Sequence, residues 1–485
     1  MVLPVLAAGG LVRLAVWWQN RSLFIDEANL ARNFCEKGLT AFLSPLDHDQ
    51  YAPPLFCMAE RLCMQYFGQQ EQALRLFPLL CGLASLVLFY HIARRLITEP
   101  WVLLMAAWIF SFSDILIRYA TEGKQYGCDL AVALGLVAWG LAQAERRFQP
   151  WLFGVAGVVA VWLSMPSVFV LFGAGLFFFR KSAVEKNTRA MLQVAGAAAV
   201  WLVSFMLNYW LILRPSLGVQ ALVEYHKTWF FPLFPGSWAQ VKQARDLLLT
   251  FPYYTAGHTV LALATGSIGT LGGVIYLVGK QKPAAFLVVL PVLVCVLVSG
   301  FGQYSLAPRM LVWAFPLALL AQGRGWQWAW ERIPAAWLIL PFVLFAATAG
   351  LQQGWQYLRK PFTIEEIRPV LEAIGRDFQA GDAIYVGHEA WPAVAYYTEC
   401  HREREHFPFS KQCIHGAWDG HPTPDRLLLD CQRPRRIWLV YSHVVSEASR
   451  HMMEADLAVI DAFAQRQQTL AQPGAYGYLY TWKPR

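Results

Sequence analysis

Long apolar stretches, each close to the length of a membrane-spanning helix, follow one another through the first 355 residues. A helix needs about 20 apolar residues to cross the hydrocarbon core, where the backbone N–H and C=O groups find no partner except one another. Only 15% of the residues are charged, against about 25% in typical soluble domains. We therefore expect a polytopic α-helical membrane protein with about eleven transmembrane helices. The predicted spans are residues 2–19, 73–93, 101–117, 126–143, 151–164, 167–179, 190–212, 257–278, 284–300, 308–322 and 334–350.

Short basic clusters between the apolar stretches predict which side of the membrane each span end faces. Cytoplasmic loops are enriched in Lys and Arg, and a basic cluster follows every second span. These clusters are Arg94-Arg95, Arg146-Arg147, Arg180-Lys181, Lys280 with Lys282, and Arg324 with Arg332. Residues 151–179 are too long for one span, and the break at Ser164-Met165-Pro166-Ser167 predicts a hairpin of two short helices. Membrane orientation thus explains the net charge of +8 without nucleic acid as a partner.

The N-terminus departs from this pattern, because no basic residue precedes the first span and Arg13 lies within it. We expect the Arg13 side chain to extend toward the outer interface marked by Trp17-Trp18, unless the natural chain begins upstream. The basic region and small-residue cleavage site of a secretory signal peptide are not found before Asp26.

Charge and histidine rise to the levels of a soluble domain beyond residue 355, which predicts a boundary near Tyr357. Residues 1–355 then form the transmembrane domain, and residues 358–485 form an extracytoplasmic α/β domain. Thr363 and Glu366 have the spacing of a capping box that opens a helix. The other predicted elements are the strands DAIYVG, RIWLVYS and YGYLYTW and the helices WPAVAYYT and SEASRHMMEADLAVIDAF. An oxidising compartment would favour one disulfide among the cysteines of this domain, which are Cys400, Cys413 and Cys431.

Acidic residues and the main polar clusters lie in the predicted outer loops, residues 20–72, 118–126 and 214–255. The first loop opens with Asp26-Glu27. From Pro54 it continues with apolar residues at helical spacing, which predicts a helix lying on the outer leaflet. Pumps and channels place ionisable residues deep inside their spans. The observed distribution therefore favours chemistry at the membrane surface.

Two polar groups allow more than one interpretation. Asp47-His48-Asp49 has the residue types of a metal site, but such a triplet also forms ordinary polar turns. Arg118 and Arg309 near the interface suit either lipid headgroups or a ligand. A divalent metal therefore stays open as a cofactor.

The order of these segments resembles the glycosyltransferase C-fold superfamily, and most closely the branch of protein O-mannosyltransferases and lipid A aminoarabinose transferases. The strongest matches are Asp26-Glu27-Ala28 after the first span, Tyr51-Ala52-Pro53-Pro54-Leu55 in the loop, and Gln72–Leu76 at the opening of the second span. Looser matches are Arg118-Tyr119-Ala120, the run RMLVWAFPLALL from Arg309, Gly381–Val386 and Tyr396-Tyr397. One departure is Ala52, where aminoarabinose transferases carry a basic residue.

The resemblance implies an inverting enzyme of the inner (plasma) membrane, which transfers a sugar from a polyprenyl-phosphate carrier to an acceptor on the outer face. Asp26 would be the catalytic base with Glu27 beside it, because one carboxylate near the acceptor hydroxyl suffices. Arg118, Lys124 or Arg309 would bind the donor phosphate. The substrate groove would contain Asp49, Tyr51, Pro53, Pro54, Tyr119, Glu122 and Tyr126. The sugar and the acceptor, whether protein, lipid or glycan, are not implied.

Two other functions fit the same composition. A multi-pass lipid or sugar transporter or flippase predicts functional charges within the spans. A non-catalytic scaffold for envelope polysaccharide assembly predicts that Asp26 and Arg118 tolerate substitution.

Overall fold

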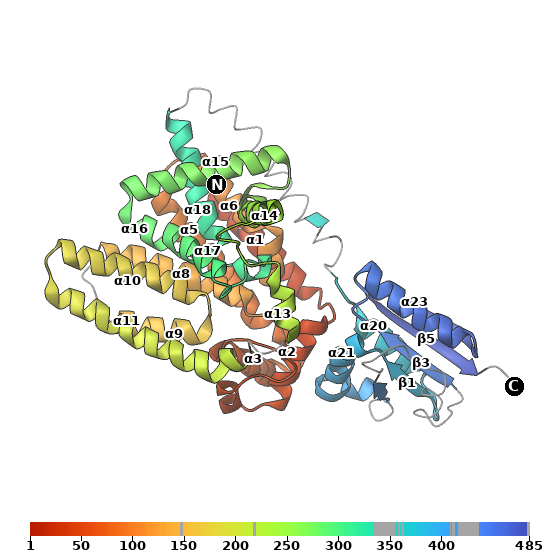
Figure 1. The fold of residues 1–485 in the computed structure, drawn as a ribbon. Coiled ribbons are helices and arrows are strands. Elements are labelled where there is room, and N and C mark those ends of the chain that lie inside the picture. The colour runs from red at the N-terminus through yellow and green to blue at the C-terminus, as the bar shows by residue number, and fades with distance from the viewer. Residues whose placement is uncertain are drawn as a thin grey trace. The chain divides into compact units, whose positions relative to one another are not determined.

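The structure, a computed structural model, describes most of the chain as two compact units (Figure 1). The described residues are 1–145, 149–216, 220–332, 355–356, 359, 363–407, 409, 413–415 and 436–482. The first unit contains residues 1–18, 40–59 and 75–360, and the second contains residues 19–39, 60–74 and 361–485. Two segments of the predicted first outer loop therefore belong with the C-terminal residues rather than with the apolar helices. Tyr357, where we expected the boundary, lies outside the described residues.

The first unit is helical. Its helices are α1 (Val2–Trp18), α5 (Leu76–Leu96), α6 (Pro100–Phe112), α7 (Asp114–Tyr119), α8 (Tyr126–Ala144), α9 (Pro150–Leu163), α10 (Ser167–Val184), α11 (Thr188–Asn208), α12 (Arg214–Ser216), α13 (Gln220–Lys227), α14 (Trp238–Ala256), α15 (Val260–Lys280), α16 (Lys282–Ala284), α17 (Leu290–Gly300) and α18 (Phe315–Arg332). Helix α3 (Pro54–Phe67) starts in this unit. π-Helical turns at Tyr209–Leu213 and Ala285–Val289 extend α11 and join α16 to α17, and a 3₁₀ turn spans Pro308–Leu311.

Within the described residues, six helical stretches are long and apolar enough to cross a membrane. They are α5, α8, α10, α15, the stretch Thr188–Leu213 and the stretch Lys282–Gly300. Helices α1, α6 and α9 are also apolar but shorter. The hairpin predicted for residues 151–179 is confirmed, because α9 ends at Leu163 and α10 begins at Ser167. The total of eleven spans stays a prediction, since residues 334–350 lie outside the described residues, as do Arg146 and Arg147.

The last predicted span that the structure describes is displaced along the chain. We expected residues 308–322, but α18 begins at Phe315 and continues to Arg332. Arg324 therefore lies within the helix, where its guanidinium stacks 3.9 Å from the centroid of the Tyr276 ring. The prediction of Arg324 as a loop residue is wrong because a ring on α15 and Glu331, 3.7 Å away on α18, provide partners inside the protein.

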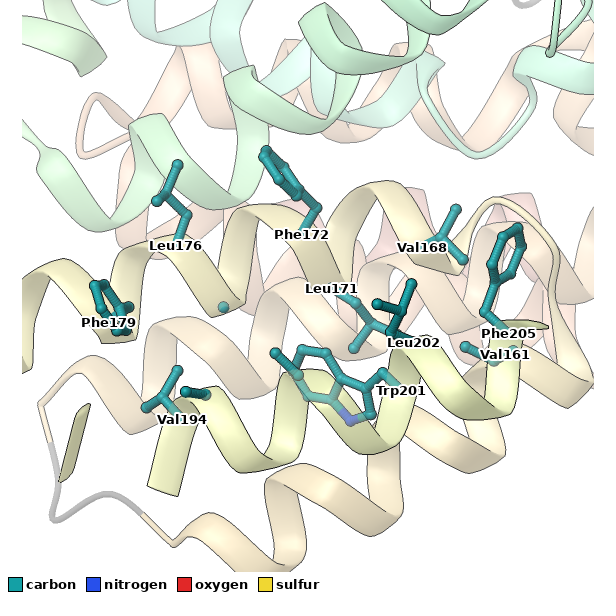
Figure 2. A pocket seen from close by; sticks show the side chains of 13 residues that line it. Val161, Val168, Leu171, Phe172, Leu176, Phe179, Val194, Trp201, Leu202 and Phe205 are labelled. Atoms are coloured by element: carbon teal, nitrogen blue, oxygen red, sulfur yellow. The ribbon is translucent and has the colours of Figure 1, made fainter. Parts of the chain in front are cut away.

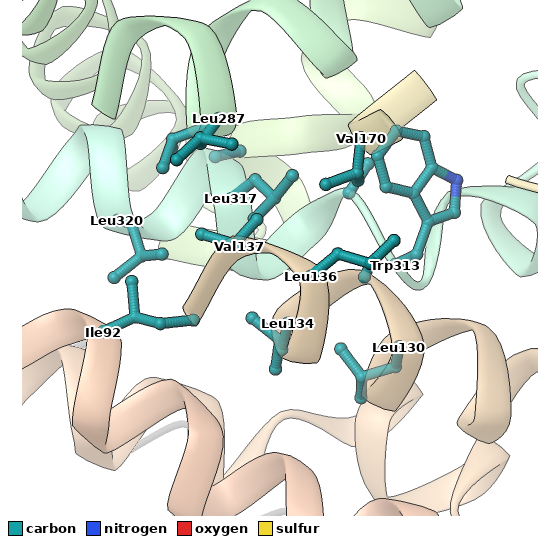
Figure 3. Packing of buried hydrophobic residues seen from close by; sticks show 14 of the residues in the cluster. Ile92, Leu130, Leu134, Leu136, Val137, Val170, Leu287, Trp313, Leu317 and Leu320 are labelled. Atoms are coloured by element: carbon teal, nitrogen blue, oxygen red, sulfur yellow. The ribbon is translucent and has the colours of Figure 1, made fainter. Parts of the chain in front are cut away.

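The core of the first unit lies between α5, α8, α10 and α18 (Figure 3). Ile92, Leu134, Val170 and Leu320 are fully or almost fully buried there. Helices α15 and α18 approach each other more closely than large side chains permit, because a Cβ atom on Gly273 would overlap the backbone of Ala321. Small residues at such a crossing allow van der Waals packing, which drives helix association in lipid.

Arg13 does not extend toward the interface as we expected. It is 1% exposed and donates hydrogen bonds to the carbonyl oxygens of Gly9, Phe110 and Ser111. Phe110 and Ser111 lie in the last turn of α6, where carbonyl groups lack helical partners and the helix dipole is negative. The guanidinium thus joins α1 to the end of α6, which was not visible in the sequence of α1 alone.

The second unit is built on a five-stranded mixed sheet with strand order β2-β1-β3-β5-β4 (Figure 1). The strands are β1 (Ala383–Val386), β2 (Cys413–His415), β3 (Arg436–Tyr441), β4 (Ala464–Gln472) and β5 (Ala475–Trp482). Strand β1 pairs in parallel with β2 and β3, and β5 pairs antiparallel with β3 and β4. Helices α20 (Ile367–Asp377) and α23 (Glu447–Asp461) cover opposite faces: a Cβ on Gly477 would meet Val370, whereas Tyr478 lies in one cluster with Met453. The remaining helices are α2 (Ile25–Glu36), α4 (Glu71–Leu74) and α21 (Trp391–Ala395).

The predicted strands DAIYVG, RIWLVYS and YGYLYTW are confirmed as β1, β3 and β5, and the two predicted helices as α21 and α23. Strand β4 was missed because its sequence, AQRQQTLAQ, is largely polar. It is an edge strand with mostly exposed side chains, so burial leaves no alternating pattern to find.

The predicted capping box is wrong. Helix α20 begins at Ile367, and Glu366 is its N-cap residue without a side-chain capping bond. The Glu366 carboxylate instead accepts hydrogen bonds from the Ser22 backbone N–H and from its hydroxyl, the latter at 2.8 Å. This residue therefore binds the segment that leads into α2, 344 positions away in the chain.

Glu71 is the centre of a buried polar network within the second unit. Its carboxylate has no exposed surface and accepts hydrogen bonds from Arg368 at 2.6 Å, Tyr397 at 2.8 Å and His401 at 3.3 Å. The Glu403 N–H donates to Nδ1 of His401, so the ring proton lies on Nε2 and points at Glu71. The Tyr397 hydroxyl also accepts the N–H of Leu23. One carboxylate therefore connects α4, the C-terminal residues and the entry to α2.

The pKa of Glu71 is lowered in the folded protein. Burial alone raises this pKa, but the hydrogen bond from His401 and the positive charge of Arg368 outweigh burial. A lowered folded pKa stabilises the protein at pH values above the unfolded pKa of about 4.3. This contribution is lost as the pH falls through the folded pKa.

Replacing Glu71 by Ala is expected to destabilise the second unit by about 3–5 kcal/mol, because Arg368 and Tyr397 lose their buried acceptor. Glu372→Ala is the matched control, since Glu372 pairs with the same Arg368 at 3.7 Å but is 44% exposed. Its loss should cost less than about 1 kcal/mol. Thermal unfolding of both variants in the same detergent measures the difference. Equal losses would contradict the central role of Glu71.

Candidate functional site

Asp26 and Glu27 lie in the first turn of α2. Helix α2 starts directly after Phe24, which has an extended backbone. The residues before Phe24 are fixed by the hydrogen bonds of Ser22 and Leu23 described above. The positive end of the helix dipole favours ionised carboxylates in this turn. Glu27 is fully buried, whereas Asp26 is partly exposed. Of these two acids, Asp26 is the one that a substrate can reach.

The charged neighbours of Asp26 within the second unit include His443, which follows β3. His443 Nδ1 donates to Glu365 Oε1 at 2.6 Å, and the Ser442 hydroxyl donates to Glu365 Oε2 at 3.0 Å. The hydrogen bond with Glu365 raises the pKa of His443; burial opposes the rise, and the charges of Glu365, Glu389 and Asp26 add to it. One imidazole thus lies among three carboxylates.

The far end of α2 packs against α21 and the π-helical turn Tyr396–Cys400 that follows it. The Cys35 thiol interacts there with the Cys400 thiol, and this contact, together with burial, raises the pKa of Cys35. Both residues are free thiols in the structure. We had considered Cys400 as a partner of Cys413 or Cys431, whose side chains lie outside the described residues.

Arg118 and Glu122 form an ion pair in the first unit, with Arg118 Nε donating to Glu122 Oε1 at 2.6 Å. The Glu122 side chain is 2% exposed and the Arg118 side chain is 30% exposed. Burial works to lower the pKa of Arg118, but the charge of Glu122 outweighs it and raises that pKa. Beside this ion pair, the rings of Tyr119 and Tyr126 pack edge to face, with their centroids 4.9 Å apart. Arg118 is therefore oriented by Glu122 and stays charged.

Arg309 belongs to the same cluster. It lies close enough to Tyr119 to act on the ionisation of that phenol, and its guanidinium is 4.5 Å from the centroid of the Tyr225 ring. His226 Nδ1 bonds the Ser305 hydroxyl at 2.9 Å. Burial and the charge of Arg309 lower the pKa of His226 to about 4, so this imidazole is neutral at pH 7. The cluster thus brings two guanidinium groups, one of them paired with Glu122, together with aromatic rings.

Lys124 lies in the turn between α7 and α8 and contacts the segment before α3. Its ammonium donates to the side-chain carbonyl of Gln50 at 2.8 Å, and the Gln125 amide reaches the Tyr51 carbonyl at 3.5 Å. These bonds join the 118–126 turn to the segment before α3. Lys124 is only 6% exposed, which limits how a ligand could reach its charge.

Asp49 is exposed in a tight turn, where both His48 and Asp49 have positive φ values. Pro53 and Pro54 are buried, and Pro54 opens α3 as a helix-starting proline. Among the residues that the structure describes, no group of three or more His, Cys, Asp and Glu side chains is placed to hold a metal ion.

The predicted site residues thus fall into two sets. Asp26 and Glu27 belong to the second unit, and the structure brings Arg118, Tyr119, Glu122, Tyr126 and Arg309 together in the first. Lys124 and Tyr51 meet through the loop bonds described above. Glu71, Glu365 and His443 were not anticipated, and His226 was noted only as a polar residue of the predicted loop 214–255. Among these contacts, only the Arg118–Glu122 ion pair has a local signal in the sequence, because the two residues are four positions apart.

An apolar cavity of about 360 Å³ opens between α10 and α11 (Figure 2). Its walls include Leu171, Phe172 and Leu176 from α10 and Trp201 and Phe205 from α11. The indole N–H of Trp201 is directed at the carbonyl oxygens of Phe153 and Gly154 in α9. This cavity suits a hydrocarbon chain and offers no group for chemistry.

Part of the chain matches a known protein family. Residues 51–210 match the family described as dolichyl-phosphate-mannose-protein mannosyltransferase. This range includes Arg118 and Lys124, whereas Asp26 and Arg309 lie outside it. An uncharacterized protein of Aquifex aeolicus (strain VF5) is 29% identical over 217 residues, which are 43% of this chain and 42% of that protein. The match therefore spans less than half of this relative.

The fold is similar to that of ArnT from Cupriavidus metallidurans. The crystal structure of ArnT in the apo state gives a TM-score of 0.52 at 13% identity, and the structure bound to undecaprenyl phosphate gives 0.51 at 12% identity. Each comparison covers 96% of both chains. The chain thus shares the fold of ArnT, and its long apolar helices indicate an integral membrane protein.

Prolonged oxidation with diamide at alkaline pH is expected to crosslink Cys35 and Cys400, because their thiols interact at the packed end of α2, although the raised pKa of Cys35 makes the reaction slow. Diamide takes up the two electrons and two protons that the new disulfide releases. Peptide mapping of the full-length protein should find the Cys35–Cys400 pair, and Cys35→Ser should abolish it. A crosslink from Cys35 to Cys63 instead would show that the packing of α2 against α21 is wrong.

Proposed function

We propose that this protein is a glycosyltransferase that moves a sugar from a polyprenyl-phosphate donor to an acceptor at the outer face of the membrane, with inversion and with Asp26 as the base. The proposal is carried by one observation. Cationic and aromatic side chains from three separate segments, around Arg118, Arg309 and Tyr225, gather in one cluster of a membrane protein with this fold. Such a cluster suits the charged headgroup of a lipid-linked donor.

The reaction needs one proton acceptor and one cation. The acceptor oxygen attacks the anomeric carbon while Asp26 takes the hydroxyl proton. The bond between that carbon and the phosphate oxygen breaks, and polyprenyl phosphate leaves with the electron pair. Because attack and departure occur on opposite faces of the sugar, the configuration inverts. A phosphate leaving group needs no general acid.

Arg118 and Arg309 are the proposed phosphate-binding residues. A planar guanidinium matches phosphate oxygens better than a point charge does. The Glu122 carboxylate aims Arg118 and keeps it charged, and neutral His226 adds no competing ion near Arg309. ArnT, whose fold is similar, has been crystallised with undecaprenyl phosphate, which supports a donor carrier of this class.

Two apolar surfaces suit the prenyl chain. Helix α3 opens at Pro54 and is amphipathic, which is typical of helices lying on a leaflet. The cavity between α10 and α11 is lined by hydrocarbon side chains (Figure 2). In this proposal the donor's phosphate headgroup binds near Arg118 and Arg309, and its prenyl chain lies in apolar surroundings.

Asp26→Asn is expected to lower kcat for sugar transfer by at least about 100-fold, because general-base catalysis contributes 10²–10⁴-fold. The matched control is Glu36→Gln on the same helix, where Glu36 pairs with Arg32 at 3.4 Å on a partly exposed face. The assay uses full-length protein in nanodiscs with a prenyl-phosphate sugar. Near-normal transfer by Asp26→Asn would refute the base. Transport of a lipid-linked sugar without transfer by the unmodified protein would favour a flippase.

Arg118→Ala is expected to raise the KM for the donor about 10- to 100-fold, the value of one lost charge-assisted hydrogen bond. Arg118→Lys should recover only part of this loss, because an ammonium keeps the charge but not the planar fork. Arg245→Ala removes a guanidinium paired with Asp246 on exposed α14 and should leave the KM unchanged. If Arg118→Ala changes the KM for the acceptor but not for the donor, the phosphate assignment is wrong.

A further inference from the structure

The entry segment, residues 20–23, leads into α2 and is bound by residues from the far end of the chain. Ser22 donates its backbone N–H and its hydroxyl to the Glu366 carboxylate, the hydroxyl at 2.8 Å. The Ser22 hydroxyl also accepts the Arg368 N–H at 3.1 Å. Arg368 Nη2 donates to the Asn20 carbonyl oxygen at 2.7 Å. These contacts all come from the first turn of α20 and the residue before it.

The Ser22 hydroxyl takes the place of a capping side chain for α20. The first N–H groups of a helix lack acceptors within the helix, and a side-chain oxygen at the N-cap position commonly supplies one. The N-cap residue of α20 is Glu366, whose side chain makes no such bond. Ser22 accepts the Arg368 N–H instead, from 346 positions away in the chain. The start of α20 and the entry segment are therefore ordered together.

Tyr397 binds the next residue of the entry segment. Its hydroxyl accepts the Leu23 N–H at 3.0 Å and donates to Glu71 Oε1 at 2.8 Å. Tyr397 is fully buried in the π-helical turn Tyr396–Cys400, and this turn also packs against α2. Single π-helical turns are rare and occur frequently at functional sites. One turn of the second unit thus binds both the entry segment and the helix that follows it.

Asp26 follows the entry segment with no loop in between. Phe24 has an extended backbone, and the bond from the Ala28 N–H to the Phe24 carbonyl oxygen at 2.9 Å closes the first turn of α2, which contains Asp26. Only Phe24 and Ile25 separate Leu23 from Asp26. A displacement of the entry segment is therefore carried to the Asp26 carboxylate.

We propose that Tyr397 and Glu366 are positioning residues for Asp26: they hold the entry segment so that the carboxylate lies where it can take the proton of the acceptor hydroxyl. This inference rests on the proposed function, because it concerns the role assigned to Asp26. In this role neither residue touches sugar or phosphate. Both act through their hydrogen bonds to Ser22 and Leu23, which gives the C-terminal residues a part in the placement of the base.

Steady-state kinetics of full-length protein in nanodiscs provide the first test. Tyr397→Phe removes the acceptor of the Leu23 N–H and is expected to lower kcat about tenfold, because misplacing a reacting group by about 1 Å can cost about 100-fold. The KM for the donor should not change. Tyr480→Phe is the matched control, since this buried hydroxyl also makes two hydrogen bonds, both at 2.8 Å, with Arg466 and Asp461 rather than with the entry segment. An equal fall of kcat in the two variants would overturn the inference.

Glu366 allows rescue by a conservative change. Glu366→Ala removes the acceptor for Ser22 and should lower kcat about tenfold. Glu366→Gln should restore most of this loss, because the side-chain carbonyl oxygen of Gln still accepts hydrogen bonds from Ser22. A Gln variant as slow as the Ala variant would show that the charge of Glu366 matters rather than its hold on Ser22, and the inference would be wrong.

A double variant separates positioning of the base from general damage. Asp26→Asn has no base left to position, so adding Tyr397→Phe should lower the residual kcat by less than about twofold. A further tenfold fall would show that Tyr397 acts through something other than Asp26. Near-normal transfer by Asp26→Asn alone would refute the proposed function at its base. Slow transfer by Asp26→Asn with a normal kcat in Tyr397→Phe would refute only the positioning role.

Hydrogen exchange gives a measurement that does not depend on activity. Because the Leu23 N–H is bonded to a buried hydroxyl, Tyr397→Phe should accelerate exchange in peptides from residues 20–28 by about tenfold or more. Tyr480→Phe should leave these peptides unchanged. Equal exchange in Tyr397→Phe and the unmodified protein would show that Tyr397 does not hold the entry segment, and would sink the inference even if the protein proves to be a transferase.

Discussion

The buried carboxylate of Glu71 joins separate segments of the second unit. Glu71 has no access to water, and a buried ion is tolerated only with charged or hydrogen-bonding partners. Its partners Arg368, Tyr397 and His401 come from the C-terminal part of the chain, as far as 330 positions away. Because Tyr397 also binds the N–H of Leu23, the same network fixes the start of the helix that carries Asp26. The candidate base is thus held by the C-terminal sheet and not by the apolar helices that flank it in sequence.

Most helices could be predicted because their signal is local. A run of apolar residues of membrane length identifies a span, and proline with serine at 164–167 identifies a break. Long-range partners have no such signal. Arg13 looked like a snorkelling residue because nothing in α1 reveals the carbonyl groups at the end of α6. Glu366 looked like part of a capping box because its real partner, Ser22, precedes it by more than 300 residues.

The candidate site was predictable to a similar extent. Resemblance to a superfamily supplied Asp26 and Arg118, and the four-residue spacing of Arg118 and Glu122 on adjoining turns is compatible with an ion pair. The residues that tune these groups were missed. Burial and the charge of Arg309 lower the pKa of His226, and the hydrogen bond with Glu365 raises the pKa of His443. A sequence shows which residues can titrate, but only the fold shows the burial, hydrogen bonds and neighbouring charges that set their pKa values.

The two units carry charged groups in different surroundings. Around Arg118 and Arg309 the first unit gathers cations and aromatic rings and keeps a histidine neutral, which favours an anion such as a departing phosphate. In the second unit, the hydrogen bond with Glu365 and the charges of Glu389 and Asp26 raise the pKa of His443 and so favour its protonated form. The inverting transfer that we propose needs a proton acceptor and a cation, since the incoming hydroxyl loses a proton while the leaving group gains negative charge.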